Sequence, residues 1–336
     1  MVDKNIASGQ GMVLGKFYVP TRGHQYLLEF ARNYVKDLTV LMCSLQREQI
    51  PAELRFQWMQ RLFPGVRIEH VTDENPQYPH EHPDFWQIWH DTIRKYIPSG
   101  PDYVFASEDY GFKLAEILGS KYVPVDQPRS IMPVSSTAVR ENPMANWEFI
   151  PFCVRPYFVR RVCVIGPEST GKTILAARLA EHYRTVLVPE YARGCIDAHQ
   201  GKVSPELFEI FLRGQAASEA ALAEQANRLL ICDSDAFTTA LYYELFYGAC
   251  PKHFYEEAGR RGYHLYLLTE CDTPFVADPQ RWHPEKREWF FDRCLDWIKK
   301  RGASYAVIKG SWEQRFEVAC RVVDELLADS KVQVPI

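Results

Sequence analysis

The chain has 336 residues, which is long enough for two domains with separate hydrophobic cores. Its hydrophobic fraction of 46% and charged fraction of 24% are typical of a soluble globular protein. A formal net charge of −4 provides no basic surface, so we expect neither nucleic acid nor an anionic membrane as a partner.

The cysteines and the apolar runs of the sequence indicate the cellular compartment of the protein. Nine cysteines are scattered without a C-x-x-C pair, which favours reduced core residues over zinc ligands or disulfides. No apolar run approaches the length of a membrane span, and the N-terminus lacks the pattern of a signal peptide. We therefore predict a cytoplasmic protein that does not enter a membrane, and leave open whether it forms a homo-oligomer.

Strands and helices are predicted to alternate in the first half of the chain. In order, the predicted elements are a strand at 11–17, a helix at 23–35, a strand at 38–43, a helix at 52–62, strands at 66–71 and from 103, a helix at 112–118 and a strand at 121–125. This alternation predicts a Rossmann-like parallel sheet. Ligands of such sheets bind beyond the carboxyl ends of the strands, so the turn after Phe17 is the first candidate site.

That turn carries a phosphate-binding motif. It runs Gly-Lys-Phe-Tyr-Val-Pro-Thr-Arg-Gly-His from Gly15 to His24, and it resembles the His/Thr-x-Gly-His signature of nucleotidyltransferases. The resemblance implies that His24 bonds the ATP phosphates, that Gly23 permits their close approach and that Lys16 adds a cation. Thr21 stands where the commoner form of the motif has a histidine. The candidate ATP ligands of this turn also include Gly15, Phe17 and Thr21.

A second motif near residue 135 matches the Ser-Ser-Thr-x-x-Arg element of the same family. Serine and threonine at a helix start cap free N–H groups and present donors to a phosphate. The candidates here are Ser135, Ser136 and Thr137, with Arg140 expected to neutralise the departing pyrophosphate. Two phosphate-handling motifs at opposite ends of one Rossmann-like domain predict nucleotidyl transfer.

Aromatic residues at helical spacing lie between the two motifs, in the segment 84–89. We favour core packing for Trp86, and the alternative is a ring that stacks on the base of the acceptor nucleotide. The segment 142–157 contains three prolines and several aromatic residues, which indicates a packed connector. We therefore predict one domain at 1–157, including the connector, and a second at 158–336.

The second domain begins with a P-loop. An apolar run at 162–165 leads into Gly-Pro-Glu-Ser-Thr-Gly-Lys-Thr at 166–173, and a helix is predicted from 174. Lys172 is expected to reach the β- and γ-phosphates of ATP, and Thr173 to offer its hydroxyl to Mg²⁺. The backbone cradle is expected to comprise Gly166, Glu168, Ser169, Thr170 and Gly171.

Alternating elements continue after the P-loop. We predict a strand at 185–190, a helix from 205 to about 226, a strand at 228–233, a helix that carries Thr238, Thr239 and Tyr242, a strand at 264–269, a helix at 285–300, a strand at 305–309 and a helix at 312–327. Asp233 and Asp235 end a buried strand, at the position where small kinases hold Mg²⁺ or accept a proton. Glu190 ends another strand, and the choice of base among these three acids stays open. Arg281 is the candidate for a basic lid over the phosphates, with Arg287 as the weaker one.

Taken together, the motifs closely resemble the bacterial bifunctional NadR family. The matching stretches include Gly-Lys-Phe-Tyr, Phe-Ala-Ser-Glu-Asp-Tyr, the P-loop, Glu-Tyr-Ala-Arg and Asp-Ser-Asp-Ala. The resemblance implies nicotinamide mononucleotide (NMN) adenylyltransferase activity in the first half and ribosylnicotinamide kinase activity in the second. The resemblance also implies that the substrates and products are nicotinamide riboside, NMN, ATP and NAD, and that Mg²⁺ is required. We expect no room for the N-terminal helix-turn-helix domain of enterobacterial members. The substrate-binding candidates are Trp86, Glu108, Tyr191, Arg193 and Asp278.

Two alternatives stay open. One is an enzyme of another cofactor pathway with the same architecture, such as coenzyme A synthesis, in which a similar nucleotidyltransferase is joined to a different kinase. The other is a first domain that senses nucleotides and has lost catalysis, which Thr21 in place of a histidine would fit. Overall, the sequence predicts an α/β protein with two parallel sheets, a Rossmann-like nucleotidyltransferase followed by a P-loop kinase.

Overall fold

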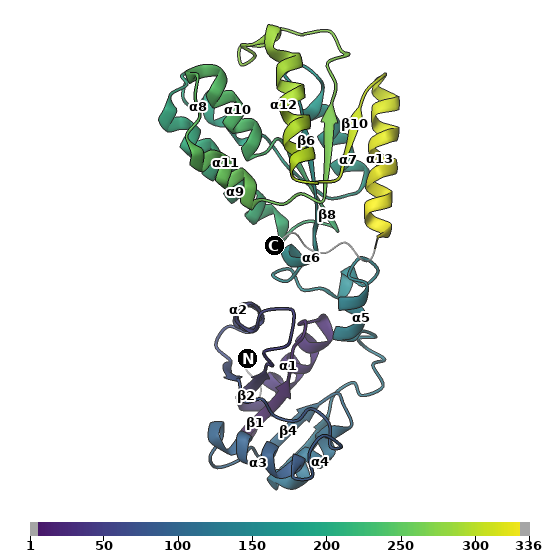
Figure 1. Cartoon of the computed structure of the whole chain (residues 1–336). Helices are drawn as coiled ribbons and strands as arrows, with labels where there is room; N and C mark the ends of the chain where they lie inside the picture. Colours follow the sequence, from purple (N-terminus) through teal and green to yellow (C-terminus); the bar gives the residue numbers. More distant parts are fainter. Residues whose placement is uncertain (1–5, 330–336) are drawn as a thin grey trace. The chain divides into compact units, whose positions relative to one another are not determined.

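The structure is a computed structural model, and it describes residues 6–329. The chain divides into two units, one up to Val154 and one from Arg155. The predicted boundary near Tyr157 falls within the short helix α6 (Arg155–Phe158) at the start of the second unit (Figure 1). Each unit is described by itself.

The first unit is built on a five-stranded sheet in the order β3-β2-β1-β4-β5. Every pair of neighbouring strands is parallel. The strands are β1 (Ala7–Gly15), β2 (Val35–Cys43), β3 (Arg67–Val71), β4 (Tyr103–Ala106) and β5 (Lys121–Pro124). β1 begins four residues before the predicted strand, because pairing with β2 extends it through residues that have little strand preference of their own.

Helices cover both faces of this sheet. The helices of this unit are α1 (Arg22–Tyr34), α2 (Ala52–Leu62), α3 (Phe85–Tyr96), α4 (Tyr110–Leu118), α5 (Ser136–Glu141) and the 3₁₀ helix η1 (Trp147–Phe149), of which α1 to α4 pack on the sheet. Successive strand residues point to opposite faces, so Met12 joins a core with α3 and α4 while Val13 joins a core with α1 and α2. Trp86 is half-buried against the first of these cores, with its ring edge-on to Phe85.

The second unit has its own parallel sheet, in the order β10-β9-β6-β8-β7. The strands are β6 (Arg160–Ile165), β7 (Val186–Val188), β8 (Leu229–Asp233), β9 (Leu265–Thr269) and β10 (Tyr305–Ile308). The helices are α7 (Lys172–His182), α8 (Tyr191–Ala198), α9 (Pro205–Ala223), α10 (Ala236–Tyr247), α11 (Lys252–Arg260), α12 (Arg287–Lys300), preceded by η2 (Pro284–Lys286), and α13 (Trp312–Ala328). β6 is central, so the loop that follows it lies mid-sheet.

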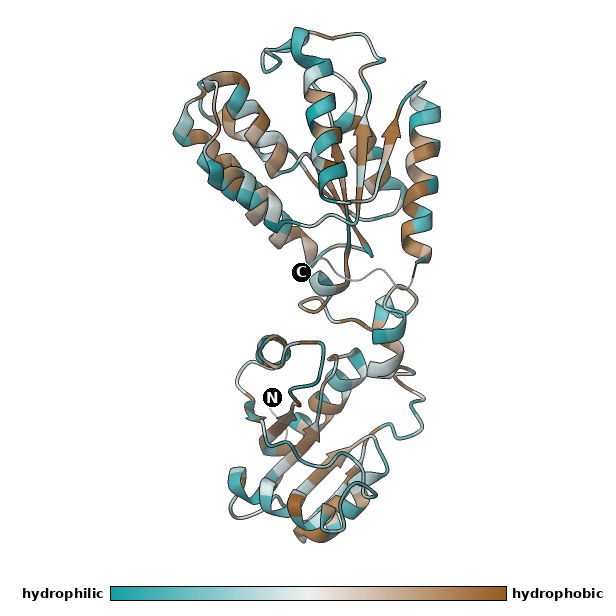
Figure 2. Ribbon diagram, in the orientation of Figure 1, coloured by the Kyte–Doolittle hydropathy of each residue, from teal (hydrophilic) through white to brown (hydrophobic). Residues whose placement is uncertain are grey.

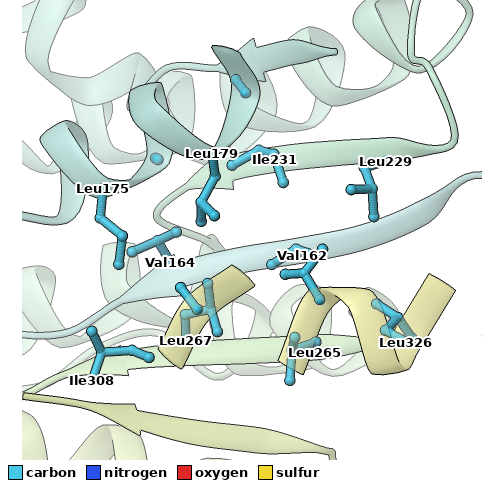
Figure 3. Packing of buried hydrophobic residues seen from close by; sticks show 14 residues of the cluster. Val162, Val164, Leu175, Leu179, Leu229, Ile231, Leu265, Leu267, Ile308 and Leu326 are labelled. Carbon is cyan, nitrogen blue, oxygen red and sulfur yellow. The ribbon is translucent and has the colours of Figure 1, made fainter. Parts of the chain in front are cut away.

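Apolar side chains of the inner strands hold the second unit together. Val162 and Val164 of β6 pack in one buried cluster with residues of α7 and α13 (Figure 3). In Figure 2 the strands are mostly brown, while the helices alternate brown and teal along their length, as expected for helices that bury one face. The labelled cluster comprises Val162, Val164, Leu175, Leu179, Leu229, Ile231, Leu265, Leu267, Ile308 and Leu326.

The predicted fold class, α/β with two parallel sheets, is confirmed. Three α-helices of the second unit, α6, α8 and α11, were not predicted. All three are short, and α8 has Gly194 in its interior, which weakens the helical pattern in the sequence. Among residues 6–329, no helix has both the length and the apolar character needed to cross a membrane.

Candidate active sites

The P-loop connects β6 to α7 through two glycines that no other residue could replace without strain. Gly166 has φ 141°, and a Cβ there would lie 2.4 Å from Thr269 Oγ1. Gly171 has φ 83°, and its Cβ would lie 2.3 Å from the ring of Trp312. The backbone therefore passes close to neighbouring groups and delivers the loop to the N-terminus of α7, where free N–H groups and the helix dipole favour an anion.

Thr173 and Asp233 form a polar pair at the start of α7 and the end of β8. Thr173 Oγ1 donates to Asp233 Oδ2 at 2.6 Å, and the other carboxylate oxygen, Oδ1, is buried without a hydrogen-bond partner among the described residues. Burial raises the pKa of Asp233, while the Lys172 charge lowers it. A hydroxyl beside a carboxylate with a free oxygen offers the hard ligands that Mg²⁺ prefers, so these residues fit that ion.

The three candidate acids occupy different environments. Glu190 precedes α8 and lines the cavity beside the P-loop. Burial raises the pKa of Glu190, and the nearby Lys172 charge opposes this effect. Asp235 instead caps α10, because its Oδ1 accepts from Thr238 N at 2.8 Å, and it is outside the cavity lining. Burial raises the pKa of Asp235 to about 6. Glu190 is therefore the acid that faces the cavity.

A lid segment, which we define as residues 273–283, is bonded to the P-loop. Thr273 Oγ1 donates to Ser169 O at 2.9 Å, and Val276 N donates to Ser169 Oγ at 2.8 Å. At its far end, the N–H groups of Trp282 and His283 donate to the two oxygens of Glu168, each at 3.4 Å. The side chains of Glu168 and Ser169 thus bind the lid segment, and both residues, which were predicted as part of the backbone cradle, line the cavity.

The lid segment is also tied to α8. Arg193 pairs with Asp278 at 2.7 Å, and Gln280 Nε2 donates to Asp197 Oδ1 at 2.5 Å. Arg281 directly follows Gln280 and lines the cavity together with Arg193. The structure therefore brings Arg281 to the P-loop, as predicted for a basic lid.

Three other predicted candidates of the second unit lie as follows. Lys172 lines the cavity, and its Nζ donates to Pro167 O at 2.8 Å. Tyr191 is outside the lining, because its ring packs against Gly214, where a Cβ would lie 2.1 Å away. Arg287 is likewise outside it and donates to Thr273 O at 3.0 Å.

Sequence analysis missed an aromatic wall of the same cavity. It is formed by side chains of α9, α10 and the lid segment, namely Phe208, Phe211, Tyr242, Phe246 and Trp282. Phe246 and Trp282 pack edge to face with ring centroids 5.0 Å apart. Pairs of aromatic residues three or four positions apart, on helices that follow the nucleotide motifs, were the available signal.

Sequence analysis also missed Arg315, which supports the P-loop from behind. Its side chain is 2% exposed, and its guanidinium donates to Thr170 O at 3.1 Å and to Gly310 O at 3.0 Å. It also forms an ion pair with Asp272. Arg315 thus fixes the carbonyl side of the loop, while the N–H side stays free for a ligand.

The first unit has a cavity of its own at the start of α1. Thr21 is the N-cap of α1, and it forms a capping box with His24, whose Nδ1 accepts from Thr21 N at 3.0 Å. With Nδ1 as the acceptor, the neutral imidazole carries its proton on Nε2. Burial, together with the Arg129 charge, lowers the pKa of His24 to about 4. His24 is therefore a neutral donor. Thr21 and Gly23 line the cavity with it.

The second motif of the first unit closes the same cavity. Ser135 caps α5 by accepting from Ala138 N at 3.0 Å, and Ser136 Oγ donates to Val19 O at 2.7 Å. Both residues and Thr137 line the cavity, as does Glu108. The two nucleotidyltransferase-like motifs, which are more than 100 residues apart in sequence, therefore meet at one site.

Several predicted candidates do not line this cavity. Lys16 Nζ lies 3.6 Å from Glu48 Oε1, and the guanidinium of Arg140 stacks 4.3 Å from the ring centroid of Tyr18. Phe17 is buried in the core, with its ring 5.0 Å from that of His24. The candidates outside the lining are Gly15, Lys16, Phe17, Trp86 and Arg140.

Comparisons with known proteins agree with the whole-chain resemblance. The family model described as an AAA domain matches residues 161–315. The "Trifunctional NAD biosynthesis/regulator protein NadR" of Escherichia coli (strain K12) is 28% identical over 96% of this chain and 84% of its own length. The protein of the same name from Salmonella typhimurium is 28% identical over 95% of this chain and 83% of its own length.

Solved structures show the same fold. A NadR protein in complex with NR matches with a TM-score of 0.78 and 21% identity, covering 97% of this chain and 98% of that one. A NadR protein in complex with NAD and AMP-PNP matches with a TM-score of 0.77 and 20% identity, covering 98% and 99%. The chain is therefore a homologue of NadR over nearly its whole described length.

Proposed function

We propose that this chain catalyses two successive steps of NAD biosynthesis, phosphorylation of nicotinamide riboside by the second unit and adenylylation of NMN by the first. The homology to NadR supports a role in NAD biosynthesis. The observation that carries the finer proposal is that each unit has its own cavity lined by a phosphate-binding motif at a helix N-terminus. The site of the second unit suits phosphoryl transfer, and the site of the first unit suits nucleotidyl transfer.

In the second unit, the proposed reaction is attack of the riboside 5′-hydroxyl on the γ-phosphate of ATP. Glu190 accepts the hydroxyl proton, since it is the candidate acid that faces the cavity and its raised pKa makes it a better base than an ordinary carboxylate. Lys172 and Arg281 neutralise the phosphate oxygens. Thr173 and Asp233 would hold Mg²⁺, which when bound supplies positive charge to the transferring phosphoryl group.

The aromatic wall suits the base of the proposed substrate. The pyridinium ring of nicotinamide riboside is a flat cation, which is attracted to aromatic faces. Phe208 and Phe211 from α9 and Tyr242 from α10 provide such surfaces beside the P-loop. This wall supports a nucleoside, rather than a small polar molecule, as the phosphate acceptor.

In the first unit, the proposed reaction is attack of the NMN phosphate on the α-phosphate of ATP, with pyrophosphate as the leaving group. No residue needs to form a covalent intermediate, so catalysis consists of holding and neutralising the phosphates. His24 donates from Nε2, and Ser135 to Thr137 present hydroxyl and N–H groups on the other side of the cavity.

The proposal is tested with a panel of acceptors for the full chain in the presence of Mg·ATP. We expect nicotinamide riboside to be phosphorylated and NMN to be adenylylated, each at least about tenfold faster than pantetheine or 4′-phosphopantetheine. Preference for the pantetheine compounds would favour the coenzyme A alternative. Tight binding of ATP and NAD without release of pyrophosphate from NMN would favour a first unit that only senses nucleotides.

A further inference from the structure

We propose that Arg129 is the cation that binds the phosphates of ATP in the first-unit cavity, and that Glu108 is its partner while the site is free of nucleotide. This inference rests on the proposed adenylyltransferase function of the first unit. It assigns the role of phosphate cation to a residue that neither nucleotidyltransferase-like motif contains.

The charges around the cavity point to Arg129. Among the described residues that line it, Arg129 is the only lysine or arginine. Lys16 lies outside the lining near Glu48, and Arg140 lies outside it against the ring of Tyr18. A triphosphate carries three to four negative charges, and with one Mg²⁺ bound to it a neutral histidine with hydroxyl groups would still leave one to two of these charges uncompensated.

Arg129 is carried by a rigid turn. The carboxylate of Asp126 accepts from Ser130 N at 2.9 Å, Ile131 N at 3.0 Å and Met132 N at 2.9 Å, while Arg129 N donates to Asp126 O at 2.8 Å. Three N–H donors satisfy the carboxylate, so Asp126 anchors the turn and does not act as a ligand for an incoming cation. The turn places Arg129 in the left-handed region, with φ 52°, beside the cavity.

Arg129 and His24 have complementary properties. Arg129 and His24 line the same cavity, and the Arg129 charge adds to the effect of burial in lowering the pKa of His24. His24 stays neutral and donates one hydrogen bond in a direction fixed by Thr21. Arg129 supplies the full charge and can bind two phosphate oxygens with its planar guanidinium, in a bidentate geometry that a lysine does not have.

Glu108 forms an ion pair with Arg129, and both side chains line the cavity. The side chains are 53% and 39% exposed, and an ion pair with this exposure contributes little free energy. Phosphate oxygens can therefore replace Glu108 as the partner of Arg129 at small cost. Until then the pair keeps the guanidinium in place at the cavity.

The test uses full-chain variants in the NMN adenylyltransferase assay, with Arg32 as the matched control. Arg32 forms a pair with Glu29 on α1 in which the side chains are 39% and 51% exposed, close to the values for Arg129 and Glu108. We expect Arg129→Ala to lower kcat/KM for ATP about 100-fold, with little change in KM for NMN, and Arg129→Lys to recover part of the loss. Arg32→Ala should stay within about twofold of wild type.

A second variant tests whether Glu108 competes with the phosphates for Arg129. Glu108→Gln should lower KM for ATP by roughly two- to fivefold, since the phosphates no longer compete with a carboxylate. Unchanged kinetics in Arg129→Ala, a rise only in KM for NMN, or a higher KM for ATP in Glu108→Gln would overturn the inference. If the wild-type chain itself fails to adenylylate NMN, the proposed function fails instead, and the two failures are thus distinguished.

Discussion

At the scale of single residues, the hydrogen-bond partners of each acid separate residues that look alike in sequence. Asp233 and Asp235 are two positions apart, yet they make different contacts. Asp233 accepts a hydrogen bond from Thr173 with one carboxylate oxygen, and its other oxygen has no partner among the described residues. Asp235 caps helix α10. Glu190 precedes α8 but makes no side-chain capping hydrogen bond, and it faces the cavity. The catalytic roles therefore follow from what each carboxylate already contacts.

Replacing Asp235 by Asn should keep the cap and remove a buried charge. The folded pKa of about 6 lies above the ordinary value of 3.8, so this group destabilises the fold increasingly as pH rises from about 4 to above 6. At pH 7.5 we expect Asp235→Asn to be more stable than wild type by about 2 kcal/mol, and near pH 4 to differ little. Native-state hydrogen exchange of the β6 amides measures both values. An equal effect at the two pH values would contradict the assignment.

The same variant separates the two carboxylates in catalysis. We expect Glu190→Gln to lower kcat of the riboside kinase by about 10²- to 10⁴-fold, because the amide cannot accept the hydroxyl proton. Asp235→Asn serves as the control and should keep activity within about threefold, since Asn is as good an N-cap. Loss of activity in Asp235→Asn, with Glu190→Gln active, would move the base to Asp235. Both are measured by NMN formation.

Some site residues could be predicted because a local motif fixes their spacing, while others could not because distant parts of the chain position them. Gly166, Lys172 and Thr173 follow from phosphate binding itself, which needs those residue types at fixed spacing. Arg129 and Arg315 gain their roles from turns and contacts far along the chain, which no local spacing encodes.

At the scale of elements, the lid segment is held by side chains of the P-loop. Glu168 and Ser169 occupy the variable positions of the motif, so sequence identifies the loop but not what these side chains bind. The alternation of strands and helices was predictable because apolar periodicity differs between the two kinds of element. Helices α6, α8 and α11 were not predicted, since each is short and the packing of the unit stabilises it.

Cutting the bond between Glu168 and the lid segment should loosen the lid. In Glu168→Ala the N–H groups of Trp282 and His283 lose their acceptor, so we expect faster hydrogen exchange across residues 273–283 and about a tenfold higher KM for ATP. Glu168→Gln keeps a carbonyl oxygen and should recover part of the affinity. Unchanged exchange in the lid segment, together with weaker ATP binding, would instead make Glu168 a direct ligand of the nucleotide.

At the scale of the whole molecule, each unit contains a parallel sheet, a core and a cavity of its own. The proposed product of the second unit is the proposed substrate of the first. Because the described residues of each cavity come from one unit, damage to one site should leave the chemistry of the other intact. Two separable activities in one chain are thus the central claim.

The most direct test supplies the full chain with Mg·ATP and nicotinamide riboside and quantifies NMN and NAD separately by chromatography. Wild type should form both compounds. Lys172→Ala should form neither from the riboside but still make NAD from added NMN, and His24→Ala should accumulate NMN. Failure of wild type to phosphorylate the riboside, or loss of NAD formation from NMN in Lys172→Ala, would contradict the account.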